Sequence, residues 1–157
     1  TEIYTLSLHD ALPICGSGTY PSIRGTVTFH PVCGGVLVSA LVTGLPAEDC
    51  PCAGEVFALH IHSGGACTGT REDPFASALT HYNPGNCPHP MHAGDLAPLF
   101  GNHGLAFGTF LTDRFSVEEV LGKTAILHRN PDDFTTQPSG SAGEKIACGV
   151  IRGCRRT

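Results

Sequence analysis

Seven side chains of this chain have types and spacings that suit metal binding. They are His60, His62, His81, His89, His92, Asp95 and His128. His60 and His62 stand two residues apart in FALHIH, so on a strand both rings would leave the same face and could chelate one ion. Imidazole nitrogens suit copper and zinc, and an aspartate oxygen beside two or three histidines suits zinc better than copper. With nine histidines in 157 residues, the sequence points to metal chemistry.

Four of these side chains fall in a segment that cannot form a helix. The segment HYNPGNCPHPMHAGD, residues 81–95, is rich in Gly, Pro and Asn, which favour turns. It belongs to an irregular stretch from residue 63 to residue 100, and loops of this length without internal structure are usually functional. Cys87 lies in the same segment, and because a thiolate is a strong zinc ligand, it is an alternative to one of the neighbouring histidines.

Composition excludes several classes of function. The chain has no run of about 18 apolar residues, so no membrane-spanning segment is predicted. Its formal net charge of -5 argues against nucleic acid or an anionic membrane surface as the partner. The length and an apolar content of 41% fit one domain with its own core, whereas twenty Gly and twelve Pro favour short strands and turns over helices.

The elements that must position the histidines are therefore short strands. Residues 22–30 alternate apolar and polar side chains, which is typical of a half-buried strand. Further strands are predicted within 34–46, 55–65, 104–112, 124–128 and 146–151, and a second long loop covers 129–145. Between two of them, SVEEVLG predicts a short helix with Ser116 as N-cap, Glu119 completing a capping box and Gly122 as the stop. This pattern predicts an all-β, antiparallel sandwich or barrel with two long functional loops.

Residues 1–14 are predicted to be non-native. The segment TEIYTLSLHDALPI back-translates to an oligonucleotide that looks like a common sequencing-library adapter read in frame. That oligonucleotide ends in one further T, which would supply the first base of the Cys15 codon. We therefore place the domain at residues 15–157, exclude His9 from every site, and regard the original start of the first strand as lost.

Six motifs, in this order, resemble the copper/zinc superoxide dismutase family: FALHIH, ACTG, HYNP, HAGD, AILHRNPDDF and GEKIACGVI. The match extends from about Gly16 to Ile151. It implies a Greek-key β-barrel and an enzyme that converts superoxide to dioxygen and hydrogen peroxide by one-electron cycling of copper next to a structural zinc. Two alternatives stay open: a non-catalytic copper-binding or copper-delivery domain of the same fold, and a structural domain that binds zinc alone.

The resemblance also implies roles for individual residues. The copper ligands would be His60, His62, His81 and His128. The zinc ligands would be His81, His89, His92 and Asp95, so that His81 bridges the two ions. Asp132 would hydrogen-bond the far nitrogens of His60 and His89 and so fix their tautomers. Cys67 and Cys148 would form the family's disulfide.

Two features depart from the family pattern. His89 and His92 are only three residues apart, so a tight turn flanked by Pro88 and Pro90 must present both rings to one ion. Lys145 stands where the family has its active-site arginine. Lysine keeps the charge but lacks the planar guanidinium fork, so we expect slower dismutation. The alternative for Lys145 is a solvated lysine in a loop.

The residues leave several properties open. Without Cys15 and the family disulfide, an odd set of cysteines remains, which implies at least one free or metal-binding thiol. These are Cys33, Cys50, Cys52, Cys87 and Cys154. Superoxide is the expected small-molecule partner, and the resemblance is compatible with a homodimer. The compartment is undetermined, although a location outside the cytoplasm is compatible with the family.

Overall fold

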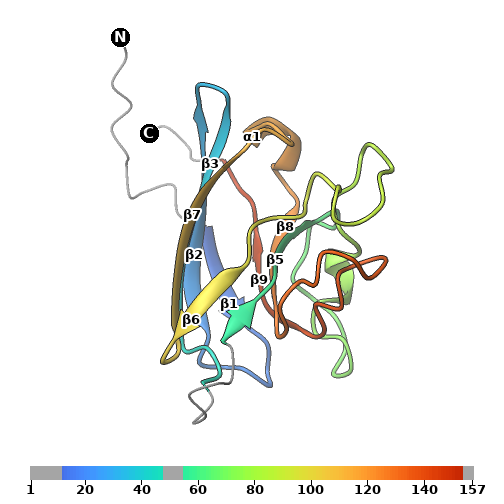
Figure 1. Cartoon of the computed structure of the whole chain (residues 1–157). Coiled ribbons are helices and arrows are strands. Elements are labelled where there is room, and N and C mark those ends of the chain that lie inside the picture. The colour runs from blue at the N-terminus through green and yellow to red at the C-terminus, as the bar shows by residue number, and fades with distance from the viewer. Residues whose placement is uncertain (1–11, 48–54, 154–157) are drawn as a thin grey trace.

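The computed structural model describes residues 12–47 and 55–153. Within them, nine strands form one antiparallel sheet (Figure 1). The strands are β1 (Leu12–Gly16), β2 (Arg24–Val32), β3 (Gly35–Thr43), β4 (Val56–Phe57), β5 (Leu59–His62), β6 (Leu99–Asn102), β7 (Leu105–Thr112), β8 (Thr124–His128) and β9 (Lys145–Val150). The two short helical elements are the 3₁₀ helix η2 (Ala76–Ala78) and α1 (Val117–Val120). The predicted all-β class is confirmed.

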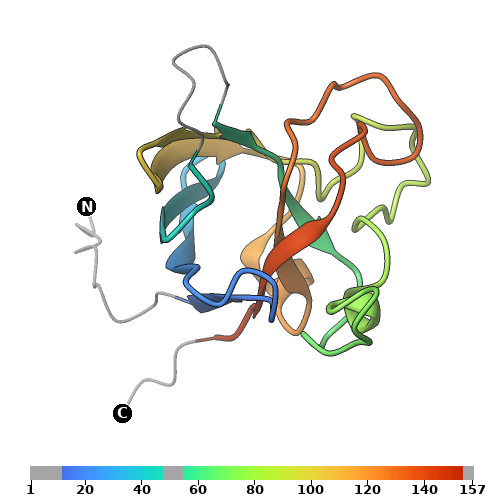
Figure 2. The same ribbon diagram turned by 90° about the horizontal axis from the view of Figure 1, so that it is seen from below.

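The sheet closes into a barrel at a single residue. The strand order is β4-β6-β7-β3-β2-β1-β9-β8-β5, so β4 and β5 stand at opposite ends although only Ala58 separates them along the chain. The Ala58 carbonyl accepts a hydrogen bond from the His128 amide, and the Ala58 amide donates to the Asn130 carbonyl, both at 2.9 Å. Seen along the barrel, the strands form a ring (Figure 2). Because β3 pairs with β7 and not with β4, the order is of the Greek-key kind.

The core is built from alternate residues of the strands. In β2 and β3 the inward side chains include Val27, Val38 and Val42, all fully buried, while their sequence neighbours are more exposed. The alternation predicted for residues 22–30 is therefore confirmed in β2, and β3 has the same pattern. In β5 buried and exposed residues do not alternate, since all four residues are buried. One face of β5 meets the core, and long loops cover the other.

Two elements differ from the sequence prediction. The predicted long loop extends to residue 100, but residues 99–102 form β6, which pairs with β7 through the two-residue turn His103–Gly104. Both turn residues have positive φ, at 51° and 80°, as a tight hairpin with strand-compatible twist requires. The second difference is η2, which lies inside the same predicted loop. The predicted capping box of α1 is confirmed, since Ser116 and Glu119 exchange side-chain to backbone hydrogen bonds.

Strand β1 includes residues assigned to the non-native segment. Ile14 is 1% exposed and lies between β2 and β9. Any apolar residue of similar size would fill this position, so the origin of residues 1–14 stays a prediction.

The two long connections, 63–98 and 129–144, lie on the same side of the barrel (Figures 1 and 2). They cover the outer face of β5 and β8, the strands that carry three of the candidate histidines. No helix in the described ranges is long and apolar enough to span a bilayer.

Candidate metal centre

Strand pairing brings the candidate histidines to one face. β5 pairs with β8, at whose end His128 lies, and an isolated bridge pairs His62 with His81. A second isolated bridge pairs His60 with Asp95. The loop that follows β5 therefore folds back along it.

The side chains gather into two groups, and in each group the candidate ligand atoms lie within 4.8 Å of one another. The first group is His60, His62, His81 and His128, and the second is His81, His89, His92 and Asp95. All of these residues are buried, and His81 belongs to both groups. All seven residues singled out from the sequence are thus brought together.

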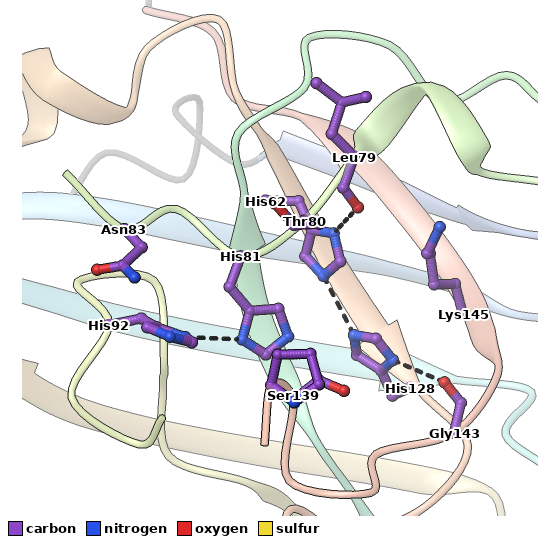
Figure 3. Close-up of a pocket in the computed structure, with 11 residues that line it drawn as sticks. His62, Leu79, Thr80, His81, Asn83, His92, His128, Ser139, Gly143 and Lys145 are labelled. Atoms are coloured by element: carbon purple, nitrogen blue, oxygen red, sulfur yellow. Dashed lines mark hydrogen bonds between the residues drawn. The ribbon is translucent and has the colours of Figure 1, made fainter. Parts of the chain in front are cut away.

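Backbone carbonyls set the tautomers of two rings in the first group. His62 Nδ1 lies 2.9 Å from the Leu79 carbonyl, and His128 Nδ1 lies 3.1 Å from that of Gly143. Because a carbonyl only accepts, each Nδ1 carries the proton and each Nε2 keeps a lone pair. The two Nε2 atoms face each other at 3.3 Å (Figure 3), an arrangement that a shared cation stabilises.

One carboxylate orients a ring of each group. Asp132 Oδ2 accepts from His60 Nε2, and Asp132 Oδ1 accepts from His89 Nε2, both at 2.8 Å. The Nδ1 atoms of His60 and His89 therefore carry lone pairs, and both are buried without a hydrogen-bond partner. This is the arrangement that the resemblance implied for Asp132. His89 Nδ1 faces Asp95 Oδ2 at 3.1 Å, and in this tautomer neither atom has a proton to donate.

The His81 ring connects the groups. Its Nδ1 lies 2.8 Å from Asp95 Oδ1 and 3.3 Å from His92 Nδ1, inside the second group. Its Nε2 is buried without a hydrogen-bond partner. The ring stands between His92 on one side and His62 with His128 on the other (Figure 3). One nitrogen is thus available to each group.

The donor atoms fit two different metals. A buried nitrogen without a partner costs about 1–3 kcal/mol, so three such atoms in one place indicate a ligand that the protein itself does not supply. The first group offers four nitrogens, which suits copper. The second offers three nitrogens and a carboxylate oxygen, which suits zinc.

Burial keeps the rings of His62 and His128 neutral, the form that binds metal. Burial, reinforced by the neighbouring His128, lowers the pKa of His62 to about 2. Burial, reinforced by His60, lowers the pKa of His128 to about 3. Burial raises the pKa of Asp132, but hydrogen bonds, of which that from His60 is the strongest, outweigh this and lower it to about 2. The orienting carboxylate is therefore ionised at neutral pH.

Sequence reasoning missed several residues that support the second group. The Gln137 side chain accepts from the His89 amide at 3.0 Å and donates to the His89 carbonyl at 2.7 Å. Gly140 has φ of +66°, and a Cβ there would lie 1.9 Å from Asp132 Oδ1. Only a glycine leaves room for this carboxylate. A glycine within SGSAG was the only available signal.

Arg114, just after β7, holds the short loop of the second group. Its Nη1 lies 2.9, 3.3 and 3.4 Å from the carbonyls of Pro90, His92 and Asp95. One guanidinium nitrogen thus gathers the turn that presents His89 and His92 three residues apart. Nothing in the local sequence marked this arginine, because its partners are backbone atoms.

The predicted disulfide between Cys67 and Cys148 is present. Cys87, the alternative ligand, is exposed, free and outside both groups, and its Sγ lies 3.7 Å from the Gly85 carbonyl. Cys15 and Cys33 are also free and exposed. Cys50, Cys52 and Cys154 lie outside the described residues.

A pocket of about 390 Å³ opens onto the first group, and His62, His81, His128 and Lys145 are among its lining residues. Lys145 is not the solvated lysine of the alternative interpretation. Its side chain is 18% exposed, and its Nζ lies 2.8 Å from a carboxylate oxygen of Asp73 and 3.2 Å from the Phe75 carbonyl.

An antiparallel barrel that carries two buried ligand groups sharing one imidazole defines a protein with two adjacent metal ions. The family model described as copper/zinc superoxide dismutase matches residues 23–151. The chain belongs to the copper/zinc superoxide dismutase family. The predicted enzyme class, with copper and zinc as cofactors and superoxide as substrate, is confirmed.

Curated relatives agree with this assignment. Superoxide dismutase [Cu-Zn] of Deinococcus radiodurans is 30% identical, over 97% of this chain and 96% of its own. Superoxide dismutase [Cu-Zn] 2 of Aquifex aeolicus is 33% identical, over 75% of this chain and 72% of its own. Superoxide dismutase [Cu-Zn] of Legionella pneumophila is 29% identical, over 89% of this chain and 85% of its own. The non-catalytic alternative gains no support from these comparisons.

Proposed function

We propose that this chain removes superoxide at the first group, with His60, His62, His81 and His128 as the copper ligands. The second group, His81, His89, His92 and Asp95, would hold zinc. The observation that carries this assignment is the His81 ring, which has one nitrogen in each group. Bound copper supplies one-electron chemistry that zinc lacks, so that one superoxide is oxidised to dioxygen and another is reduced to hydrogen peroxide.

The protein's own residues prepare the site for this chemistry. The carbonyls of Leu79 and Gly143 and the Asp132 carboxylate hold three of the rings in one tautomer. The ring of His81 differs from these three. Its Nδ1 faces the second group, so no acceptor outside the two groups fixes the tautomer of this ring. His81 Nε2 is therefore the atom in the first group at which a proton can be held and given to reduced oxygen.

Lys145 is proposed to attract superoxide into the pocket. It is the one pocket-lining residue with a permanent positive charge, and a cation in a cleft raises the association rate of a small anion. The ammonium offers a point charge where a guanidinium would offer a planar fork, so K145R should change the rate.

The experiment combines metal analysis with a direct superoxide-decay assay. We expect about one copper and one zinc per chain and rapid decay. His62→Gln should lose copper and activity but retain zinc, because His62 belongs only to the first group. His103→Gln, in the exposed turn between β6 and β7, is the matched control. Wild-type protein that holds both metals without consuming superoxide would support the copper-delivery alternative instead.

We also propose a homodimer through the outer face of β3, β6 and β7. These three strands contain no charged residue. Their exposed large apolar side chains are Leu41, Phe100, Leu105, Phe107 and Leu111. Leu41 and Phe107 are direct cross-strand partners. Two copies that each carry a net charge of -5 repel, so an uncharged apolar face is where they can meet.

Light scattering at micromolar concentration tests the dimer. We expect the wild type to have twice the chain mass and Phe107→Lys to be monomeric with both metals bound. Thr26→Lys, on the outer side of the neighbouring β2, should remain dimeric. A wild-type monomer would overturn this proposal.

We further propose that residues 15–157 are the native part of this chain and that residues 1–14 replace the original start of the first strand. The back-translation of residues 1–14, which looks like an in-frame adapter, supports this boundary. Sequencing the genomic locus tests it, and an uninterrupted reading frame through these codons would refute it.

A further inference from the structure

The pocket above the first group contains a cation that is already paired. Lys145 Nζ lies 3.0 and 2.8 Å from the two carboxylate oxygens of Asp73. Among the described residues that line the pocket, Lys145 is the only lysine or arginine. The charge that an incoming anion meets there is therefore offset by a carboxylate within hydrogen-bond distance.

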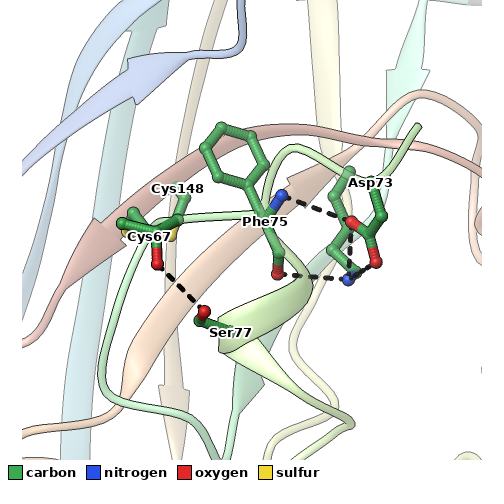
Figure 4. Close-up of a disulfide and its surroundings, with 7 residues drawn as sticks. Cys67, Asp73, Phe75, Ser77 and Cys148 are labelled. Atoms are coloured by element: carbon green, nitrogen blue, oxygen red, sulfur yellow. Dashed lines mark hydrogen bonds and ion pairs between the residues drawn. A yellow bond between two sulfur atoms is a disulfide. The ribbon is translucent and has the colours of Figure 1, made fainter. Parts of the chain in front are cut away.

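The Asp73 carboxylate is fixed before any anion arrives. Its Oδ1 accepts from the Phe75 amide at 3.3 Å, and its backbone amide donates to Thr70 Oγ1 at 3.2 Å. The disulfide attaches this segment to β9, six residues before Asp73 at Cys67 and three residues after Lys145 at Cys148. In Figure 4, Phe75 lies between the disulfide and Asp73. The disulfide thus joins the two segments that carry the ion pair, in which the Asp73 side chain is 47% exposed.

We infer that Asp73 lowers the anion affinity of this pocket by holding and neutralising Lys145, so that it acts as a positioning residue for substrate attraction. The inference rests on the proposed role of the pocket as the entrance for superoxide. Asparagine at this position would remove the negative charge but keep an oxygen that accepts from Lys145 and from the Phe75 amide. Lys145 would also keep its bond to the Phe75 carbonyl. The cation would stay in place and act on the pocket unopposed.

Azide is the probe, since it is a small monoanion that binds copper without being consumed. Its affinity for the copper- and zinc-loaded protein is followed by the azide-to-copper absorption band. We expect Asp73→Asn to bind azide about three- to tenfold more tightly than wild type at low ionic strength, with a smaller difference at 0.15 M salt. Superoxide decay should accelerate in the same direction. Asp73→Ser, which can also accept from the Phe75 amide, serves as a second variant if Asp73→Asn folds poorly.

Two comparisons separate a local effect from a change in net charge. Glu72 precedes Asp73, and its side chain is exposed and forms no ion pair among the described residues. Glu72→Gln removes the same amount of charge and should change azide affinity by less than about 1.5-fold. In a Lys145→Gln background, Asp73→Asn should have no further effect, because Asp73 acts through the lysine.

The outcomes distinguish this inference from the proposed function. Unchanged azide affinity in Asp73→Asn, or a gain that persists without Lys145, overturns the inference while leaving the enzyme assignment intact. A wild-type protein that binds copper but neither azide nor superoxide overturns the proposed function and the inference with it.

Discussion

Asp132 accepts a hydrogen bond from Nε2 of His89 at 2.8 Å, and its other carboxylate oxygen accepts one from His60 at the same distance. His89 belongs only to the second ligand group and His60 only to the first. A single carboxylate therefore fixes a ring on each side of the shared His81. The two groups are thus connected twice, once through His81, which belongs to both, and once through Asp132, which orients one ring of each.

Asp132→Asn should weaken the binding of both metals. An amide can accept from only one of the two rings, so it forces the other ring into the wrong tautomer or leaves it without a partner. We expect copper and zinc affinities to fall about 10- to 100-fold, as measured by competition with a chromophoric chelator. Asp133→Asn removes a neighbouring exposed carboxylate and should leave both affinities within about threefold. Equal affinities in Asp132→Asn and wild type would show that His60 and His89 are oriented by other contacts.

Arg114→Ala should weaken zinc and spare copper. The arginine holds three carbonyls of the turn that presents His89 and His92, and none of its hydrogen bonds reaches the first group. We expect a loss of about 10-fold in zinc affinity, since supporting groups of this kind contribute at that scale. Arg24→Ala is the matched control, because Arg24 also donates to two carbonyls, those of Pro21 and Ile23, in a loop without metal candidates. A zinc loss of equal size in both variants would contradict the proposed role.

The metal-free protein should lose stability on mild acidification. Burial lowers the pKa of His62 to about 2 and that of His128 to about 3, whereas the unfolded chain takes up these protons near pH 6.5. The unfolded state therefore binds more protons below pH 6.5, and the free energy of unfolding falls as the pH falls. Between pH 7 and pH 5 we expect a loss of about 2–4 kcal/mol.

Urea unfolding in the presence of a chelator measures this loss. His62→Asn should reduce the dependence on pH by about half. A free energy of unfolding that is flat between pH 7 and pH 5 would show that these rings are not buried in the metal-free state.

Removing the disulfide should destabilise the fold. Cys67 and Cys148 are separated by 81 residues, and closing a loop of that length is worth about 4–5 kcal/mol in the loop-entropy model. The double variant Cys67→Ser/Cys148→Ser should therefore unfold at markedly lower urea concentration. Cys33→Ser, at a free and exposed cysteine, is the control. A double variant as stable as the control would mean that the unfolded chain gains little freedom from losing the bond.

The sequence predicted the candidate metal-binding side chains better than the groups that position them. Side chains such as His60, His62 and His128 are visible in a sequence because their types are rare and their spacing is regular. The carbonyls of Leu79 and Gly143 have no sequence signature, since every residue has a carbonyl and only the fold decides which one meets a ring.

The same holds for part of the fold. Strand β2 is long enough for its alternation to be recognised, whereas β6 has four residues, one of them a glycine. The segment itself did not reveal whether His89 and His92, only three residues apart, could both face one ion. Its explanation lies with Arg114 and Gln137, which come from distant parts of the chain.

The closure of the barrel at Ala58 links metal retention to unfolding. The residue that joins the first and last strands of the sheet accepts a hydrogen bond from the backbone of His128, and the proposed ligand His60 follows two residues later. Loss of this hydrogen bond would free the backbone of His128 from the segment that leads into His60. A metal bound by both His60 and His128 would connect the two segments that meet where the barrel closes. Its release and the opening of the barrel should therefore occur as one cooperative event.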